Sequence, residues 1–212
     1  MNYLVTAGPT REFIDDIRYV SNLSSGRMGY ALAAAAGDAG HDVILISGPC
    51  TLPAPAGAEL ISIVSADQMR EAVLNSLPKA DIIVMCAAVA DYRPARRIPG
   101  KMKKGPDVMS LELVKTPDIL AELGTLEAKK FLVGFALEAE NALENARAKM
   151  ASKKADMIVL NSPAAIGAET SAVQVLTPDG GATRIGPAAK EIIAAKLIKT
   201  IDSRFNEEPA QP

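Results

Sequence analysis

Short apolar runs alternate with helical patterns along this chain. The apolar runs are rich in β-branched residues and do not alternate with polar ones, which is typical of parallel strands buried on both faces. These runs lie at residues 3–6, 42–47, 60–64, 81–86, 131–135 and 156–160, and the helical patterns lie at residues 25–39, 66–76, 117–123, 139–153 and 186–201. The alternation predicts an α/β fold with a Rossmann-like, doubly wound and mainly parallel sheet.

Turn signals within residues 172–185 predict a small β-hairpin extension. Two apolar stretches there flank the sequence PDGG at residues 178–181, which favours a tight reversal of the chain. We expect this hairpin, or the strand-like segment 109–114, to serve in dimerisation. Residues 1–202 are expected to form one domain, and the polar tail at residues 203–212 is expected to be disordered.

Two helix starts carry capping signals. Ser25 is placed to cap the helix predicted at residues 25–39, and Ser65 is placed to form a reciprocal capping box with Gln68. Gly40 supplies a glycine stop after the first of these helices.

The composition describes a protein that can bury a substantial core. Of its 212 residues, 49% are hydrophobic and 23% are charged, and Trp is absent. The formal net charge of −2 provides no global basic field that would attract nucleic acid or anionic lipid. No apolar run approaches the roughly 18 residues of a membrane span, and no signal peptide precedes the first strand, so we expect a cytoplasmic protein.

Histidine and cysteine provide little for catalysis. His41 is the sole histidine and opens a predicted strand, which argues against a histidine-based triad or metal site. Cys50 and Cys86 offer neither a disulfide framework nor a metal cluster. Since Cys86 lacks a base partner, a buried small hydrophobe is favoured over a nucleophile.

Glycines and small hydroxyl residues follow the first apolar run and precede the first long helix. Backbone N–H groups at a helix start can bind a phosphate, and glycine allows its close approach. If the strand order is the common 3-2-1-4-5-6, the first and fourth strands are neighbours where the winding reverses. Residues 7–11 and 87–92 then face each other across one crevice, which is the predicted ligand site.

Neither standard nucleotide fingerprint fits this segment. A nicotinamide-binding domain has an acidic residue at the end of its second strand, whereas residues 45–49 read LISGP. A P-loop requires a Lys directly before Ser or Thr, and none is present here. A Rossmann-type reductase using NADPH and a non-catalytic nucleotide-binding module remain as weaker alternatives.

Several polar residues have both a functional and an ordinary interpretation. The carboxamide of Asn22 can hold an acyl intermediate, or it can make only a local turn bond. Lys101, Lys103 and Lys104 lie on a Gly/Pro-flanked loop and form either a flap over a triphosphate or a solvated charge run. Lys149 and Lys153 share one face of a predicted helix, which by itself is a weak signal.

Taken in order, the motifs of this chain resemble phosphopantothenoylcysteine synthetase, the coenzyme A biosynthetic enzyme often fused behind a flavin-dependent decarboxylase. The resemblance covers residues 3 to about 200. It is carried by TAGPTRE at 6–12, SNLSSGRMG at 21–29, AAVADY at 87–92, KMKK at 101–104, VKTPDI at 114–119 and VGF at 133–135.

The resemblance implies a CTP-dependent ligase in two steps. The carboxylate of 4′-phosphopantothenate attacks the α-phosphate of CTP to give an acyl-cytidylate and pyrophosphate, and the amine of cysteine then displaces CMP. It also implies a homodimer and a Mg²⁺ ion that accompanies the triphosphate through phosphate oxygens and water, with no protein metal ligand assigned. No nucleic-acid or membrane partner is expected.

Residue roles carry over from the same resemblance. Asn22 and Lys101 are the expected catalytic residues, and the expected phosphopantothenate-binding residues are Asn22, Ala87, Ala88 and Asp91. The expected nucleotide-binding residues are Gly8, Ser24, Ser25, Gly26, Gly29, Asp91, Lys101, Thr116, Pro117, Asp118, Ile119, Phe135, Lys149 and Lys153.

The chain departs from the family pattern at three places. Arg27 stands where Lys is common, Thr116 stands where Asn often precedes Pro-Asp, and residues 162–164 lack a frequent Asp. The first two changes retain charge or hydrogen bonding. The third leaves the role of residues 162–171 open, and the choice between CTP and ATP is also open at this point.

Overall fold

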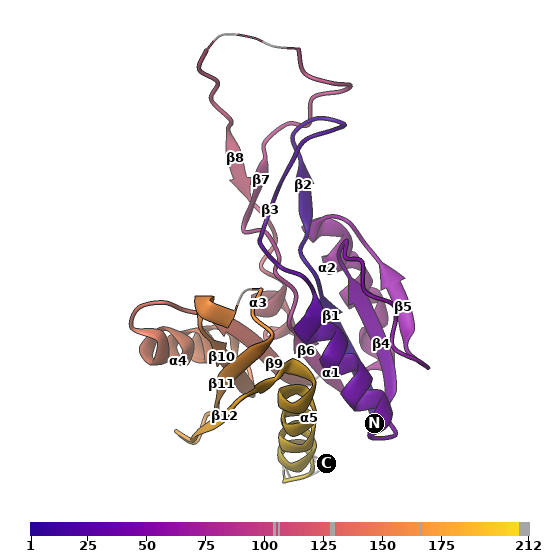
Figure 1. The fold of residues 1–212 in the computed structure, drawn as a ribbon, viewed down its shortest axis with the longest axis vertical. Coiled ribbons are helices and arrows are strands. Elements are labelled where there is room, and N and C mark those ends of the chain that lie inside the picture. Colours follow the sequence, from indigo (N-terminus) through magenta and orange to yellow (C-terminus); the bar gives the residue numbers. More distant parts are fainter. Residues whose placement is uncertain (104, 106, 128–129, 166, 208–212) are drawn as a thin grey trace.

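The protein consists of a sheet-centred body and a narrow arm that projects from it (Figure 1). The structure is a computed structural model, and it describes residues 1–103, 105, 107–127, 130–165 and 167–207. Among these residues, no helix combines the length and apolar character needed to cross a lipid bilayer.

An eight-stranded sheet has the order β12-β11-β10-β9-β6-β1-β4-β5. The six strands from β10 to β5 are parallel, and β11 and β12 add an antiparallel hairpin at one edge. The strands are β1 (Asn2–Ala7), β4 (Asp42–Ser47), β5 (Glu59–Ser62), β6 (Ile82–Met85), β9 (Phe131–Leu137), β10 (Met157–Asn161), β11 (Thr170–Leu176) and β12 (Ala182–Ala189). This confirms the doubly wound sheet, the 3-2-1-4-5-6 order of its parallel part and the predicted hairpin.

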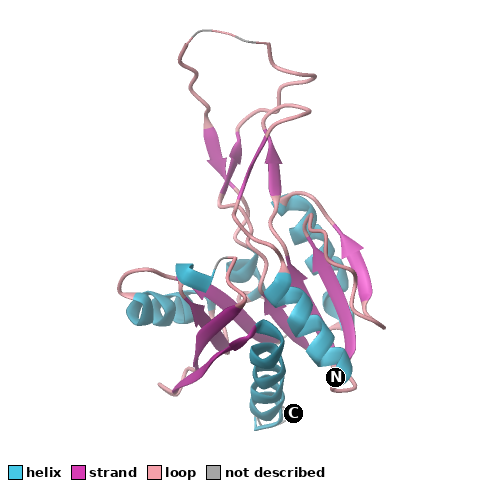
Figure 2. Ribbon diagram, in the orientation of Figure 1, coloured by secondary structure: helices cyan, strands magenta, loops and turns pink. Residues whose placement is uncertain are grey.

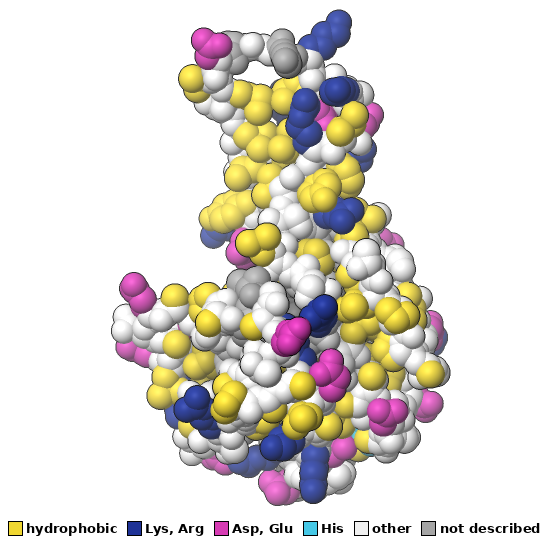
Figure 3. All heavy atoms as spheres, in the orientation of Figure 1, with side chains coloured by type: hydrophobic (Ala, Val, Ile, Leu, Met, Phe, Trp, Pro, Cys, Tyr) yellow, Lys and Arg dark blue, Asp and Glu magenta, His cyan; other side chains and the backbone are white. Residues whose placement is uncertain are grey.

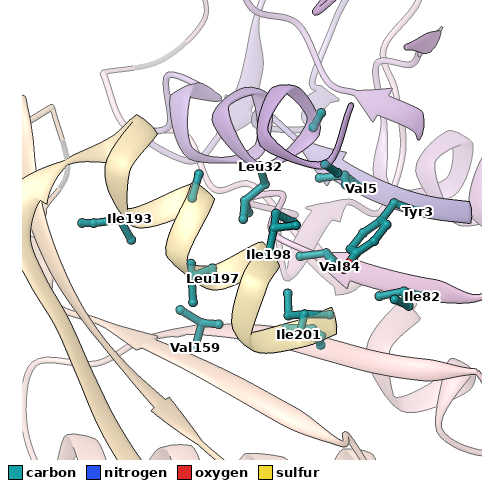
Figure 4. Close-up of a cluster of buried hydrophobic side chains, with 14 of the residues drawn as sticks. Tyr3, Val5, Leu32, Ile82, Val84, Val159, Ile193, Leu197, Ile198 and Ile201 are labelled. Carbon is teal, nitrogen blue, oxygen red and sulfur yellow. The ribbon is translucent and has the colours of Figure 1, made fainter. Parts of the chain in front are cut away.

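Helices cover both faces of the sheet (Figure 2). Alternate residues of each parallel strand point to opposite faces and enter two separate hydrophobic clusters. On one face they pack against α1 (Arg27–Asp38) and α5 (Lys190–Glu207), where Leu32 meets Ile198 and Val84 (Figure 4). The other face is covered by α2 (Ala66–Ser76), α3 (Ile119–Leu123) and α4 (Ala142–Lys153), and the 3₁₀ turns are η1 (Leu77–Lys79) and η2 (Pro163–Ala165).

The two helix starts with capping signals behave differently. Ser65 caps α2 and forms the predicted capping box with Gln68. At α1 the predicted cap was wrong, because Gly26 in the left-handed conformation (φ 77°) occupies the N-cap position without a side-chain hydrogen bond. A left-handed backbone is open to glycine and unfavourable for serine.

The C-terminal boundaries also differ from the sequence prediction. Residues 186–189 belong to β12 instead of the last helix, and α5 continues to Glu207, so disorder was the wrong prediction for residues 203–207. Phe205 makes an edge-to-face contact with Phe131, and Asp202 accepts a hydrogen bond from the buried hydroxyl of Tyr3. These contacts attach the end of α5 to the sheet, while residues 208–212 lie outside the described residues.

The arm is built from two antiparallel hairpins that were not predicted as such. One pairs β2 (Arg11–Phe13) with β3 (Tyr19–Ser21), and the other pairs β7 (Tyr92–Pro94) with β8 (Leu113–Lys115). The loop between β7 and β8 forms the outer end of the arm (Figure 1). It holds Lys101 and Lys103, whereas Lys104 lies outside the described residues.

Candidate active site

The loops that follow β1 and β6 lie side by side as predicted, but backbone hydrogen bonds join them directly, from Ala88 to Gly8 and from Thr10 to Ala88. The crevice lies beside this pairing, between residues 86–88 and the start of α1, and residues 7–11 do not line it. The hydroxyl of Thr6 accepts hydrogen bonds from the backbone N–H groups of Cys86 and Ala87, each at 3.1 Å. Four residues further along the chain, the hydroxyl of Thr10 accepts a hydrogen bond from the N–H of Ala90 at 3.0 Å. These side chains continue the pairing of two parallel strands beyond their ends, which fixes the two loops face to face.

The start of α1 opens into this crevice. Gly26 holds the left-handed turn before the helix, and the N–H of Tyr30 makes the first helical bond to its carbonyl. The preceding amides of the first turn therefore have no helical acceptor, which is the arrangement that binds anions. Gly29 serves packing as well, because a Cβ there would lie 2.5 Å from the Cβ of Ala7.

A pocket lies at the carboxyl ends of β1, β6, β9 and β10. Predicted site residues on its wall are Ser24, Ser25, Gly26, Gly29, Ala87, Ala88 and Phe135. Its other lining residues are Leu23, Arg27, Met28, Cys86, Ala136, Leu137, Asn161, Gly167 and Lys190. Lys190 is the functional candidate that sequence reasoning missed.

Asn22 approaches the crevice from the arm side. Its side-chain amide donates to the carbonyl oxygen of Val89 at 2.9 Å and to that of Ala88 at 3.4 Å. The contact joins the β3–α1 loop to the β6–β7 loop, so Asn22 makes more than a local turn bond. Its catalytic role stays a prediction.

A network behind Phe135 contains four more of the predicted nucleotide-binding residues: Thr116, Asp118, Lys149 and Lys153. Lys149 donates to the carbonyl oxygen of Phe135 at 2.8 Å, and Lys153 pairs with Asp118 at 2.6 Å. Asp118 also caps α3, and Thr116 donates through its hydroxyl to Ala90 at 2.6 Å. The network connects α4 and α3 to the crevice loop, although its side chains do not line the pocket.

Titration in this network follows from burial and charge. Burial lowers the pKa of the Lys149 ammonium, and the carboxylates of Glu138 and Asp118 oppose this change. Burial acts to raise the pKa of Asp118, but the hydrogen bonds from Lys153 and the N–H of Ala121, together with the charges of Lys153 and Lys149, outweigh it and the pKa falls. The Asp118 carboxylate is therefore ionised near neutral pH and pairs with Lys153.

Cys86 is not an activated nucleophile. Burial raises the pKa of its thiol to about 12, and the nearby charge of Lys190 opposes this only in part. The thiol is therefore protonated at neutral pH. This agrees with its interpretation as a small hydrophobic wall residue.

The described residues offer no protein cage for a metal ion. Within them, no three His, Cys, Asp or Glu side chains gather into a group that can hold a cation. The Mg²⁺ ion that the family resemblance implies, carried by substrate phosphates and water, stays a prediction.

Lys101 lies on the loop between β7 and β8 and does not line the pocket. The turn between β2 and β3 holds its neighbours: Asp16 accepts from the N–H of Gly100 at 2.8 Å, and Asp15 accepts from the N–H of Met102 at 3.1 Å. Asp15 also binds Arg18, whose guanidinium reaches the carbonyl oxygen of Met102. This clasp, formed by Asp15, Asp16 and Arg18, holds the residues on both sides of Lys101. We call the connection between β7 and β8 (residues 95–112) the lysine loop.

Four predicted nucleotide-binding residues remain: Gly8, Asp91, Pro117 and Ile119. Gly8 adopts a left-handed conformation (φ 72°) against Gly48, and Pro117 precedes the cap of α3. Asp91 accepts a hydrogen bond from the N–H of Thr116 through its carbonyl oxygen, and Ile119 is buried in the core. Gly8, Pro117 and Ile119 thus shape the site through the backbone and packing.

Comparison with known proteins identifies the family of this chain. A family model described as the DNA/pantothenate metabolism flavoprotein C-terminal domain matches residues 1–205. The chain belongs to this family. The match includes both the body and the arm.

Its relatives agree with this assignment. The chain is 44% identical over 203 residues to the coenzyme A biosynthesis bifunctional protein CoaBC of Bacillus subtilis, covering 93% of this chain and 50% of the relative. The corresponding protein of Escherichia coli K12 is 38% identical over 217 residues, covering 98% of this chain and 53% of the relative. The chain thus spans about half the length of the curated relatives it matches.

Solved structures cover the whole chain. The crystal structure of the C-terminal domain of CoaBC matches with a TM-score of 0.85 and 37% identity, over 98% of this chain and 96% of that domain. A DNA/pantothenate metabolism flavoprotein from Streptococcus pneumoniae matches with a TM-score of 0.84 at 23% identity, over 96% of this chain and 99% of that one, which shows the shared fold.

The clasp gives a first testable prediction. Burial acts to raise the pKa of Asp15, but hydrogen bonds from the N–H groups of Ile17, Arg18 and Met102 outweigh it and hold the pKa at about 2. The carboxylate therefore contributes stability above its ordinary pKa of 3.8, and this contribution is lost as the pH falls toward 2. The Asp15→Asn variant is expected to increase amide hydrogen exchange at Gly100 and Met102 at neutral pH.

Mass spectrometry of peptides covering residues 96–103 measures this effect. Asp38→Asn is the matched control, because it removes an exposed carboxylate at the end of α1, on the body. Equal exchange in wild type and Asp15→Asn would contradict the anchoring role.

Proposed function

We propose that this chain is a phosphopantothenate–cysteine ligase that uses CTP. The observation that carries the proposal is its family membership together with the full-length structural match to the CoaBC C-terminal domain. The chain would join the carboxylate of 4′-phosphopantothenate to the α-phosphate of CTP, releasing pyrophosphate. The amine of cysteine would then attack the acyl carbon, forming the amide and releasing CMP.

The chemistry of the pocket supports a reaction of this kind. Its lining residues include Arg27 and Lys190 and, among the described residues, no carboxylate. The amides at the start of α1 add further positive potential. Nucleotide activation of a carboxylate needs anion binding, orientation and charge stabilisation more than a strong base.

We assign the nucleotide to the side of the pocket formed by Gly26 and Phe135. The phosphates would contact the first turn of α1, and the base would lie toward the network of Lys149, Lys153 and Asp118. Since Lys149 holds the carbonyl of Phe135, the network would fix the position of that residue against the base. A preference for CTP over ATP would arise from contacts of the base with Phe135 and this network.

Phosphopantothenate would occupy the crevice between Asn22 and residues 87–91. Asn22 is held by the carbonyl oxygens of Ala88 and Val89, so its free oxygen can be directed toward an incoming amine. A Mg²⁺ ion bound to the triphosphate would supply charge neutralisation. Lys101 would approach the pocket when the arm, to which the clasp attaches it, moves toward the body.

We further propose that the arm mediates homodimerisation. Large apolar side chains are exposed on it and form the hydrophobic surface along the arm in Figure 3. They include Ile17, Tyr19, Tyr92, Val108, Met109, Leu113 and Val114. Such surface is typical of an interaction site, and it includes the segment 109–114 expected to pair. The hairpin of β11 and β12 lacks comparable exposed side chains in its described residues.

The bacterial relatives perform coenzyme A biosynthesis, and the cytoplasm stays the predicted location of this chain.

A direct assay tests the ligase proposal. Protein mixed with 4′-phosphopantothenate, CTP, Mg²⁺ and cysteine is expected to release pyrophosphate and CMP, which chromatography can quantify. A folded sample that releases neither would refute the proposal. Binding of NADPH without CTP would instead favour a Rossmann-type reductase, and CTP binding without turnover would favour a non-catalytic module.

Two variants test the residue roles in that assay. Asn22→Asp places a carboxylate against two carbonyl oxygens, and Lys101→Gln removes the flap charge, so each is expected to lower kcat roughly 10–100-fold. Lys199→Gln on the exposed face of α5 is the control. Wild-type turnover in both variants, with an unchanged melting temperature, would contradict the assigned roles.

The Leu113→Glu variant tests the dimer. A charge at the centre of the apolar surface is expected to weaken association at least tenfold, measured by sedimentation equilibrium. Leu143→Glu is a matched control, since Leu143 on α4 is 42% exposed and Leu113 is 43% exposed. Equal association of the two variants would place the interface elsewhere.

A further inference from the structure

A second pocket of about 200 Å³ lies where the arm joins the body (Figure 1). Its wall carries Arg11 of β2, Arg93 of β7 and Arg97 of the lysine loop, and we call it the arginine pocket. Ser65, the N-cap residue of α2, lines it from the body. The arginine pocket shares no lining residue with the active-site pocket or with the exposed apolar surface of the arm.

Two of the three guanidinium groups lie on aromatic rings. The guanidinium of Arg11 lies 4.7 Å from the ring centre of Tyr19, and that of Arg97 lies 5.0 Å from the ring centre of Phe13. The rings of Phe13 and Tyr19 are themselves in edge-to-face contact. Such stacking uses the flat face of a guanidinium and leaves the N–H groups at its edge for other partners. The aromatic pair therefore positions two positive charges at the pocket.

The protein partners of these arginines use only part of their hydrogen-bonding capacity. Arg97 donates through one amino group to Asp16 at 2.8 Å, and Asp67 lies 3.8 Å from the Nε atom of Arg93, which is too long for a hydrogen bond. The side chain of Arg11 makes no hydrogen bond or ion pair with any described residue. Since a guanidinium has five N–H donors, all three arginines keep donors for a further acceptor.

The Nε–H group of Arg93 is buried, and it donates to no acceptor among the described residues. A buried donor without an acceptor destabilises a folded protein, so such groups are uncommon away from functional sites. An acceptor bound in the arginine pocket would satisfy this donor.

The arginine pocket also has a positive balance of charge. Among the described residues that line it, Glu12 is the only carboxylate. Glu12 is 4% exposed and accepts a hydrogen bond from the N–H of Ala66, at the start of α2, at 2.8 Å. The positive end of the α2 dipole offsets part of its charge. Three guanidinium groups therefore outweigh one carboxylate that is already bound to the protein.

We propose that the arginine pocket binds a phosphate group, either as free phosphate or as part of a phosphate monoester. Guanidinium N–H groups match phosphate oxygens in pairs, and a tetrahedral phosphate presents oxygens to donors that approach from several directions. Arg11 belongs to one hairpin of the arm, whereas Arg93 and Arg97 belong to the other. A bound phosphate therefore joins the two hairpins beside the start of α2.

NMR of the arginine Nε–H groups tests this site directly. Protein labelled with ¹⁵N is titrated with inorganic phosphate, and sodium chloride is adjusted to keep the ionic strength constant. The Nε–H resonance of Arg93 is expected to shift saturably, because the buried donor gains an acceptor. The Arg93→Lys variant lacks this group and so assigns the resonance.

Arg11→Gln removes one guanidinium and leaves the Arg93 resonance as the reporter. Its affinity for phosphate is expected to fall roughly tenfold or more. If this variant does not fold, Arg97→Gln gives the same measurement with the same expected loss, because the Arg97 side chain is 58% exposed. Arg184→Gln is the matched control, since it removes an exposed arginine of β12 that does not line the arginine pocket, and it is expected to bind phosphate as wild type does.

Two further ligands identify the source of the phosphate. If 4′-phosphopantothenate binds at lower concentration than inorganic phosphate and pantothenate has no effect, the pocket takes a phosphate monoester. If inorganic phosphate binds at least as tightly, the pocket takes free phosphate. Either result supports the phosphate site.

The absence of a saturable shift of the Arg93 resonance with both phosphate ligands would overturn the proposal. Equal affinities of wild type, Arg11→Gln and Arg97→Gln would do the same, as would an equal loss in Arg184→Gln. The ligase assay gives an independent result. Phosphate binding here without release of CMP would refute only the proposed function, and release of CMP without phosphate binding here would refute only this inference.

Discussion

The pairing of the β1 and β6 loops through two buried threonine hydroxyls determines the geometry of the whole site. Thr6 and Thr10 have no exposed surface, and they bind the backbone of residues 86, 87 and 90. The strands end here, but backbone hydrogen bonds from Ala88 to Gly8 and from Thr10 to Ala88 continue their pairing. The hydroxyls add to these bonds, so the two loops are fixed against each other where the winding of the sheet reverses.

The pocket and the arm have different physical properties. The pocket lies on the body, where two layers of helices bury the sheet and restrict movement of its wall. The arm consists of short hairpins with exposed apolar side chains, and its lysine loop depends on the clasp around Asp15. In the proposed reaction, the pocket on the body and Lys101 on the arm would act together to shield a reactive acyl intermediate from water.

Much of this architecture could be predicted from the sequence, because the parallel strands are continuous apolar runs and each follows or precedes a clear helical pattern. The short strands of the arm escaped prediction because strands of three residues carry no periodicity. Ser25 was wrongly assigned as a helix cap because its neighbour Gly26 can adopt a left-handed conformation that serine disfavours. Phe205 and Asp202 order the C-terminal helix through long-range contacts that its polar local sequence does not indicate. Lys190 was missed for a different reason: no motif surrounds it, and only the direction of the correctly predicted hairpin places it at the ligand edge.

In the proposed reaction, the carboxylate of 4′-phosphopantothenate attacks the α-phosphate of CTP in this pocket. Substrate labelled with ¹⁸O in the carboxylate tests this step, with mass spectrometry of the nucleotide product. Attack on the α-phosphate followed by amide formation leaves one carboxylate oxygen on CMP, so we expect one ¹⁸O atom in each CMP released. Unlabelled CMP, or CDP formed together with ¹⁸O-labelled inorganic phosphate, would contradict it.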